Sequence, residues 1–170
     1  MGYGSFPYQV TYLIHLAAVV VGFGSSFVYP LLAARSKNLP PREAYAVSHT
    51  ALGISPYLTT YPIYTAGATG VLLVILSDQA IAFSSTWISI AFLVFFLGVL
   101  VSVFLHTPNL KAMDALQEKL LDAPPGDAPP EVAELEERGQ KAAMYGGLLH
   151  LFWLVLMVDM VWKPGTTSNF

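Results

Sequence analysis

The chain contains no cysteine and few charged residues. Only 11% of its 170 residues are Asp, Glu, Lys or Arg, whereas soluble domains carry about 25%. The absence of cysteine excludes disulfides, thiolate metal sites and thiol catalysis. A net charge of −3 leaves no basic patch, so nucleic acid is not an expected partner. No Ser-His-Asp set, phosphate loop or zinc-ligand spacing is present, which argues against soluble-type hydrolytic chemistry.

The chain is instead dominated by four long apolar runs, and 55% of its residues are hydrophobic. A transmembrane helix needs about 20 mainly apolar residues to cross a hydrocarbon core about 30 Å thick. The runs therefore predict an all-α polytopic membrane protein, a single domain formed by an antiparallel bundle of four transmembrane helices. The expected spans are residues 8–34, 46–76, 86–106 and 142–162.

The basic residues concentrate on one side of the predicted membrane. The first and third loops hold all of them except Lys163: Arg35, Lys37, Arg42, Lys111, Lys119, Arg138 and Lys141. The positive-inside rule then places both loops in the cytoplasm and both termini outside. The first span is too long for a signal peptide and no positive segment precedes it, so we expect it to stay uncleaved.

The cytoplasmic loop 107–141 is predicted to be partly helical. Residues 110–121 place apolar side chains at helical spacing between charges, which predicts an amphipathic helix lying along the membrane surface. The prolines of residues 122–130 predict an exposed loop. From Pro130 onward, acidic residues follow a proline as at a helix N-terminus, so we expect this helix to project from the membrane and continue into the fourth span.

The second span contains Pro56 and Pro62 among tyrosines and threonines. Each proline removes a helical hydrogen bond, and nearby hydroxyl groups or waters can satisfy the freed carbonyls. A kinked helix that carries Tyr61 and Tyr64 at mid-membrane depth suggests a polar pocket. A packed kink with satisfied hydroxyls is the alternative, and the sequence leaves both open.

Small residues form two patches that predict close contacts between helices, because helices in lipid associate through close backbone approach. The first span carries Gly22, Gly24, Ser25 and Ser26, and the second carries Ala66, Gly67, Ala68 and Gly70.

Each apolar run carries or borders one histidine. A helical rise of about 1.5 Å per residue places His150 within about 5 Å of the midplane and His15 about 10 Å into the outer half. His49 and His106 fall about 15–22 Å from the midplane on the cytoplasmic side, where they are cheap to solvate and suit anchoring roles. Ionisable residues inside a membrane often mark function. His15 and His150 are therefore candidate site residues, and a hydrogen-bonded structural role stays open for both.

The same helical rise places Asp159 at the depth of His15, about 10 Å into the outer half of the membrane. Lys163 follows one turn later on the same helical face, so the favoured expectation is an ion pair between the two that reaches the membrane surface. The alternative is a contact between Asp159 and His15, which would hold the imidazole in one tautomer as a carboxylate does beside a metal-bound histidine.

Short motifs along the chain resemble those of a group of bacterial four-helix membrane proteins. The first is Tyr12-Leu-Ile-His15 with Gly22, Gly24 and Tyr29-Pro30, the second is Trp87 at the start of the third span, and the third is Pro108 followed by Lys111. The last is Met157-Val-Asp-Met-Val-Trp-Lys-Pro164. The group includes an uncharacterised family of predicted integral membrane proteins, the HemJ-type protoporphyrinogen oxidases and the CopD-like copper-resistance proteins.

The resemblance implies a location in a bacterial cytoplasmic (inner) membrane and a haem b site that uses His15. The second and third spans contain no lysine or arginine, which differs from the HemJ pattern and argues against protoporphyrinogen oxidation. The histidine- and methionine-rich outer surface expected for copper handling is also absent. No metal beyond haem iron is expected.

Ligand geometry separates two arrangements of a haem. Two axial histidines must approach one iron from opposite sides, so their depths must agree. His49 and His106 meet this condition, and His150 lies one or two turns from them, whereas His15 and His150 differ by about 14 Å. A haem would therefore use His49, His106 or His150 on the cytoplasmic side, or His15 with a weak or absent second ligand.

Three function classes follow. The first is a haem b protein of the membrane that acts in electron transfer or a redox step. The second is a cofactor-free accessory or assembly subunit of a larger, respiratory-type membrane complex. The third is a small-solute transporter, which the lack of inverted repeats and of paired mid-membrane charges disfavours. The expected partners are the lipid bilayer and other membrane subunits or a second copy of the chain, and the sequence leaves enzymatic activity undecided.

Overall fold

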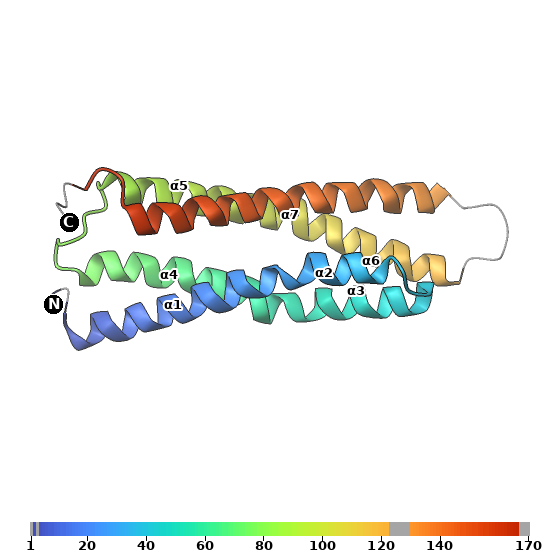
Figure 1. The fold of residues 1–170 in the computed structure, drawn as a ribbon, viewed down its shortest axis with the longest axis horizontal. Helices are drawn as coiled ribbons and strands as arrows, with labels where there is room; N and C mark the ends of the chain where they lie inside the picture. The colour runs from blue at the N-terminus through green and yellow to red at the C-terminus, as the bar shows by residue number, and fades with distance from the viewer. Residues whose placement is uncertain (1, 3, 123–129, 167–170) are drawn as a thin grey trace.

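The computed structural model describes residues 2, 4–122 and 130–166. Four long helical segments run antiparallel along one axis (Figure 1), which confirms the predicted all-α bundle. Their elements are α1 (Phe6–Ser26), α2 (Val28–Ser36), α3 (Pro41–Ser55), the π-helical segment η1 (Pro56–Thr60), α4 (Tyr61–Leu76), α5 (Thr86–Leu100), the π-helical segment η2 (Val101–His106), α6 (Thr107–Leu121) and α7 (Pro130–Trp162).

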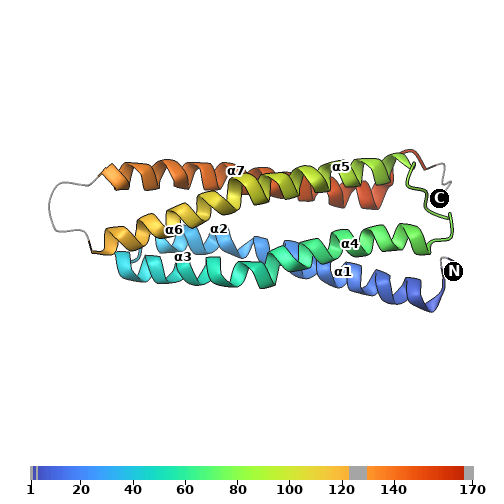
Figure 2. The same cartoon turned by 180° about the vertical axis from the view of Figure 1, so that it is seen from behind.

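The two ends of the bundle differ in what they carry. Both termini and the α4–α5 connection lie at one end, here called the terminal end (Figures 1 and 2). The α2–α3 turn, the end of α6 and the start of α7 lie at the other, here called the loop end. The described charged residues belong to the loop end, between Arg35 and Glu43 or between Lys111 and Lys141, except for Asp78, Asp159 and Lys163.

Each long segment exceeds what one membrane crossing requires. The four candidate spans contain 31, 36, 36 and 33 residues, which is about 46–54 Å of helix against a hydrocarbon core about 30 Å thick. Because the terminal half is apolar and the loop end carries the charges, the terminal half matches the membrane. The loop end then extends beyond the membrane as a helical bundle.

The third segment corrects one prediction. Residues 110–121 do not lie along a membrane surface, because α6 continues α5 through η2 and packs against α3 and α7. Pro108 lacks an N–H and would normally interrupt a helix. In η2 the chain has already shifted to π-type bonding, with the Thr107 N–H donating to the Ser102 carbonyl five residues earlier. This wider turn carries the helix past the proline, so the apolar face of α6 meets other helices.

The fourth segment confirms the prediction made for Pro130. One uninterrupted helix, α7, runs from Pro130 to Trp162 and joins the loop end to the terminal end. The exposed loop expected between α6 and α7 falls on residues 123–129, which lie outside the described part of the chain.

The second segment also continues past its prolines through π-type hydrogen bonding. The Tyr61 N–H donates to the Pro56 carbonyl five residues earlier, immediately before Pro62. Pro62 has no N–H to offer the Leu58 carbonyl, and the Ser25 hydroxyl of α1 donates to that carbonyl at 2.7 Å. Ser25 also lies 2.7 Å from the Thr59 hydroxyl. The kink is therefore a packed one, with its freed carbonyl satisfied from the neighbouring helix.

We expect Ser25→Ala to lower the free energy of unfolding by about 0.6 kcal/mol and by no more than about 1.7 kcal/mol, the average and the largest values for hydrogen bonds between membrane helices. The change leaves the Leu58 carbonyl without its donor from α1. Ser36→Ala is the matched control, because the Ser36 hydroxyl donates only to Ala33 of its own helix. Denaturant unfolding in detergent measures both variants, and equal losses would show that the contact between Ser25 and Leu58 contributes nothing.

Glycines set the close contacts between helices, as the small-residue patches predict in part. Gly22 of α1 is buried, and a Cβ added there would lie 3.0 Å from the Ile63 side chain. Gly67 of α4 receives the ring of Phe95 from α5, and a Cβ added at Gly67 would overlap with the Phe95 Cζ. Gly24 has nothing within 4 Å of such an atom, so it does not belong to the packing patch.

Candidate functional site

Polar side chains connect the helices near the middle of the bundle. On α1, Ser25 bonds to η1 as described, and the hydroxyl of the next residue, Ser26, lies 3.1 Å from Nε2 of His150 on α7. Gly146 of α7 lies close to His106 of η2. A Cβ added at Gly146 would lie 3.8 Å from the His106 Cε1. The two π-helical segments therefore contribute to one polar region shared by all four long segments.

His150 occupies this region in a defined tautomer. Its Nδ1 lies 2.8 Å from the Gly146 carbonyl one turn earlier. A carbonyl oxygen can only accept, so Nδ1 carries the proton, and in the neutral ring Nε2 accepts from the Ser26 hydroxyl. The Phe27 ring packs against the imidazole with centroids 4.6 Å apart. Both nitrogens of His150 are thus engaged by protein groups.

His106 has a less complete environment. Its Nδ1 is buried and has no hydrogen-bond partner among the residues that the structure describes. Buried polar atoms are rarely left unpaired, because losing water without a replacement bond is costly. π-Helical segments are often found at functional sites, so this unpaired nitrogen keeps His106 as a candidate site residue.

His15 lies about 16 Å from this region, because His150 contacts Ser26, eleven residues further along the first segment. It packs against α4, where its Nδ1 is 2.9 Å from the Ala66 carbonyl and 3.2 Å from the Thr69 hydroxyl oxygen. Nδ1 therefore carries the proton. In the part of the chain that is described, Nε2 of His15 has no hydrogen-bond partner.

Space for the His15 ring comes from a glycine. A Cβ added at Gly70 would lie 3.4 Å from the His15 Cε1. Thr69 donates its own hydroxyl proton to the Thr65 carbonyl at 2.6 Å, which leaves its oxygen free to accept from His15. Gly70 stood out in the sequence as a small residue, but nothing in the sequence indicated that Thr69 contacts His15, because its helix register relative to α1 was unknown.

His49 does not join the other histidines. It is exposed on α3, and its Nδ1 lies 3.0 Å from a carboxylate oxygen of Asp114 on α6. Asp114 follows His106 by eight residues, about 12 Å along the same segment. The expectation that His49 and His106 lie at one depth and could clamp one iron is therefore wrong. The depths were counted from the centre of each apolar run, and those centres do not give the register of the second segment against the third.

The expected ion pair between Asp159 and Lys163 is absent. Asp159 is only 4% exposed, and neither carboxylate oxygen has a hydrogen-bond partner among the described residues. The helix ends at Trp162, and Lys163 adopts φ +44°, which turns it off the helical face of Asp159. Its ammonium lies instead 5.6 Å from the centre of the Trp87 ring. The alternative partner, His15, is held by α4 and forms no hydrogen bond with Asp159.

Tyr61 and Tyr64 do not enclose the polar pocket that the kinked second span suggested. Their exposed fractions are 55% and 41%, so both lie on the outer surface of the bundle. The polar contacts expected of them are made by Thr59, whose hydroxyl lies 3.2 Å from that of Tyr29.

Asn109 is a buried polar residue that the sequence analysis missed. It lies in α6 and is 6% exposed. Its amide donates to the Arg138 carbonyl of α7 at 2.9 Å, which joins the two helices at the loop end. A lone asparagine after Pro108 gives no periodic signal, so only the packing of α6 on α7 identifies it.

These observations define the class: a polytopic helical membrane protein with separate polar sites along one bundle. A family model described as "Predicted integral membrane protein (DUF2269)" matches residues 9–164, so the chain belongs to that family. Searches of curated proteins and of solved structures found no match.

Proposed function

We propose that the protein binds haem b in the membrane through His15 and takes part in electron transfer or a membrane redox step. The observation that carries the proposal is the pairing of the two ring nitrogens. Nδ1 donates to the Ala66 carbonyl, and Nε2 keeps its lone pair without a described protein partner. Metal-bound histidines usually have this arrangement, in which the second nitrogen donates to a carbonyl or carboxylate that fixes the tautomer.

The residues around His15 suit such a ligand. The Ala66 carbonyl and the Thr69 hydroxyl hold the ring orientation, and the absence of a side chain at Gly70 leaves space beside it. Haem iron held by an imidazole supplies one-electron chemistry, which the protein tunes through ligand bonding and burial. His150 is less suited, because its Nε2 is already within hydrogen-bond distance of Ser26. The resemblance to haem-linked four-helix proteins points to the same residue.

A visible absorption spectrum tests the proposal. The protein is expressed with a sufficient haem supply, purified in detergent and compared with the same preparation expressed without haem supplementation. We expect a Soret band and a pyridine haemochrome of the b type. Protein that is folded by circular dichroism yet shows no Soret band, even after titration with haemin, would contradict the proposal.

We also propose that the loop end faces the cytoplasm of a bacterial cell and that both termini lie outside. The supporting observation is the charge distribution, because seven basic residues belong to the loop end and only Lys163 to the terminal end. Basic residues flanking spans are retained on the cytoplasmic side. In this orientation His15 and Asp159 lie in the outer half of the membrane.

A further inference from the structure

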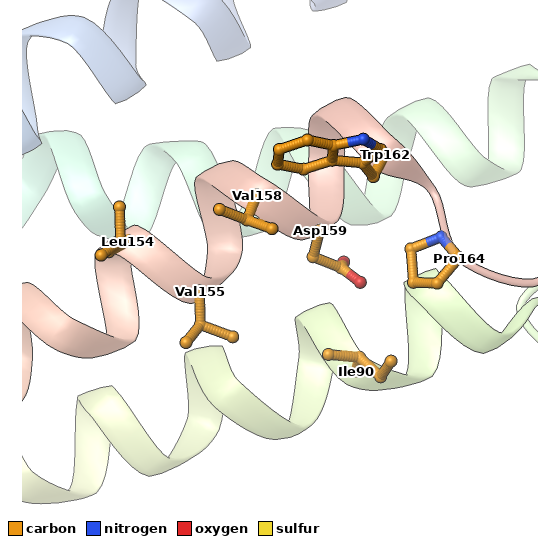
Figure 3. A pocket seen from close by; sticks show the side chains of 7 residues that line it. All are labelled: Ile90, Leu154, Val155, Val158, Asp159, Trp162 and Pro164. Carbon is orange, nitrogen blue, oxygen red and sulfur yellow. The ribbon is translucent and has the colours of Figure 1, made fainter.

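A pocket of about 440 Å³ opens between α5 and α7 near the terminal end. Its walls are Ile90, Leu154, Val155, Val158, Trp162 and Pro164, and all of these side chains are apolar or aromatic. The one polar side chain that lines it is Asp159. Figure 3 shows the carboxylate pointing from α7 toward α5, on the side of Ile90 and Pro164. The volume lies within the range of about 300–1,000 Å³ typical of small-molecule sites.

Asp159 is the residue that gives the pocket its chemistry. It is 96% buried, and both oxygens lack a hydrogen-bond partner among the described residues. Buried carboxylates are ordinarily paired with a cation or with several donors, because burial removes their water. Intramembrane carboxylates follow the same rule and mark binding sites or pathways. An unpaired one that lines a pocket therefore indicates a missing partner.

No described cation of the chain occupies that position. Lys163 is the only lysine or arginine at the terminal end, and it lies over the Trp87 ring in a left-handed conformation after the helix has ended. The remaining lysines and arginines belong to the loop end. Among the described residues, none supplies the partner of Asp159.

We propose that this pocket binds an amphiphilic ammonium ion, a primary amine carried on an apolar chain. The ammonium group supplies a positive charge and three N–H donors, which match a carboxylate with two unpaired oxygens. The apolar walls accept the chain, and the exposed side chains of Leu154, Val158 and Trp162 open the pocket to the lipid. A free amphiphile and the ammonium of a phospholipid headgroup share this chemistry. The proposal does not depend on haem binding.

The test uses the full chain in nanodiscs of phosphatidylcholine, whose headgroup has no N–H. A long-chain primary amine brominated near its nitrogen is titrated, and quenching of tryptophan fluorescence is recorded. The part of the signal that disappears in Trp162→Phe reports the pocket. We expect saturable quenching in the wild type, and an increase of at least tenfold in the half-saturating amine concentration in Asp159→Asn, which keeps the shape and removes the charge.

Two controls separate charge recognition from partitioning into lipid. The alcohol of the same brominated chain, at equal mole fraction in the bilayer, should quench weakly and equally in wild type and Asp159→Asn. Asp78→Asn removes one charge from the α4–α5 connection at the same end and should leave amine binding unchanged. Equal binding of amine and alcohol by the wild type, or equal amine binding by wild type and Asp159→Asn, would overturn the proposal. Should Asp159→Asn fail to fold, the comparison of amine with alcohol in the wild type decides alone.

A change in lipid composition distinguishes a phospholipid headgroup from a free amphiphile as the source of the ammonium group. When part of the phosphatidylcholine is replaced by phosphatidylethanolamine, a rise in the half-saturating amine concentration assigns the site to the headgroup of that lipid. An unchanged concentration assigns it to a free amphiphile.

Discussion

His15→Ala is expected to remove nearly all bound haem from the purified protein. The ratio of the Soret absorbance to the protein absorbance should fall by more than about tenfold, since even the indirect partners of a metal ligand are worth about 10–100-fold in affinity. The physical reason is that the Ala66 carbonyl holds Nδ1 of His15 while its Nε2 has no described hydrogen-bond partner, whereas both nitrogens of His150 are engaged. Absorption spectra of wild type and variant, taken at equal protein concentration, make the measurement.

Three companion variants show whether the loss is specific. His49→Ala changes an exposed residue paired with Asp114 and should keep the wild-type spectrum. His150→Ala should keep haem as well, with reduced stability from the lost contact to Ser26. His15→Gly with added imidazole should recover the Soret band, because the free ring can enter the space left by the side chain. Haem retained in His15→Ala but lost in His150→Ala would contradict this assignment and show that the haem ligand is His150, in the polar region near the middle of the bundle.

Gly22→Val is expected to lower the free energy of unfolding by about 1–3 kcal/mol, the usual cost of overpacking. A Cβ at position 22 would lie 3.0 Å from the Ile63 side chain, 3.1 Å from the Ile63 backbone nitrogen and 3.2 Å from Pro62. The backbone of a proline-containing segment cannot yield easily, so α1 must move away from α4. Because His15 is held by α4, the same movement should weaken its bonds to Ala66 and Thr69.

Gly24→Val is the matched control for this change. It is the same substitution two residues later in the same helix, and nothing lies within 4 Å of its added Cβ. Thermal unfolding in detergent should leave Gly24→Val close to wild type and shift Gly22→Val clearly downward. Equal shifts would mean that valine is costly anywhere in α1, and the tight contact between α1 and α4 would then carry no special energy.

The fold could be predicted from the sequence because the membrane imposes it. Apolar runs of about 20 residues have few alternatives in lipid, since every backbone hydrogen bond must be satisfied within the segment. What the runs could not show was where helices end. Pro108 and the charges of residues 110–121 suggested a break and a surface helix, but π-type bonding at Thr107 carries the helix through.

The site was predicted less completely, because depth alone does not define contacts. The separation of His15 from His150 was predicted correctly and places them in different sites. The ion pair between Asp159 and Lys163 failed because it assumed a helix that continues past Trp162. The predicted equal depth of His49 and His106 was wrong because the centre of an apolar run does not give the register between two helices. The hydroxyl and carbonyl partners of the histidines depend on helix rotation, which the spacing of apolar residues does not determine.

Every site described above depends on four crossings of the membrane, with both termini on one face. Because the chain has no native cysteine, single cysteines report this directly. Gly4→Cys, Ser84→Cys and Thr166→Cys sample the terminal end, and Asn38→Cys and Glu136→Cys sample the loop end. In intact cells, a membrane-impermeant maleimide should label the first three variants, and the last two only after the membrane is opened. Labelling of Gly4→Cys and Thr166→Cys from opposite faces, or of all five from one face, would contradict the four-crossing bundle and the sites built on it.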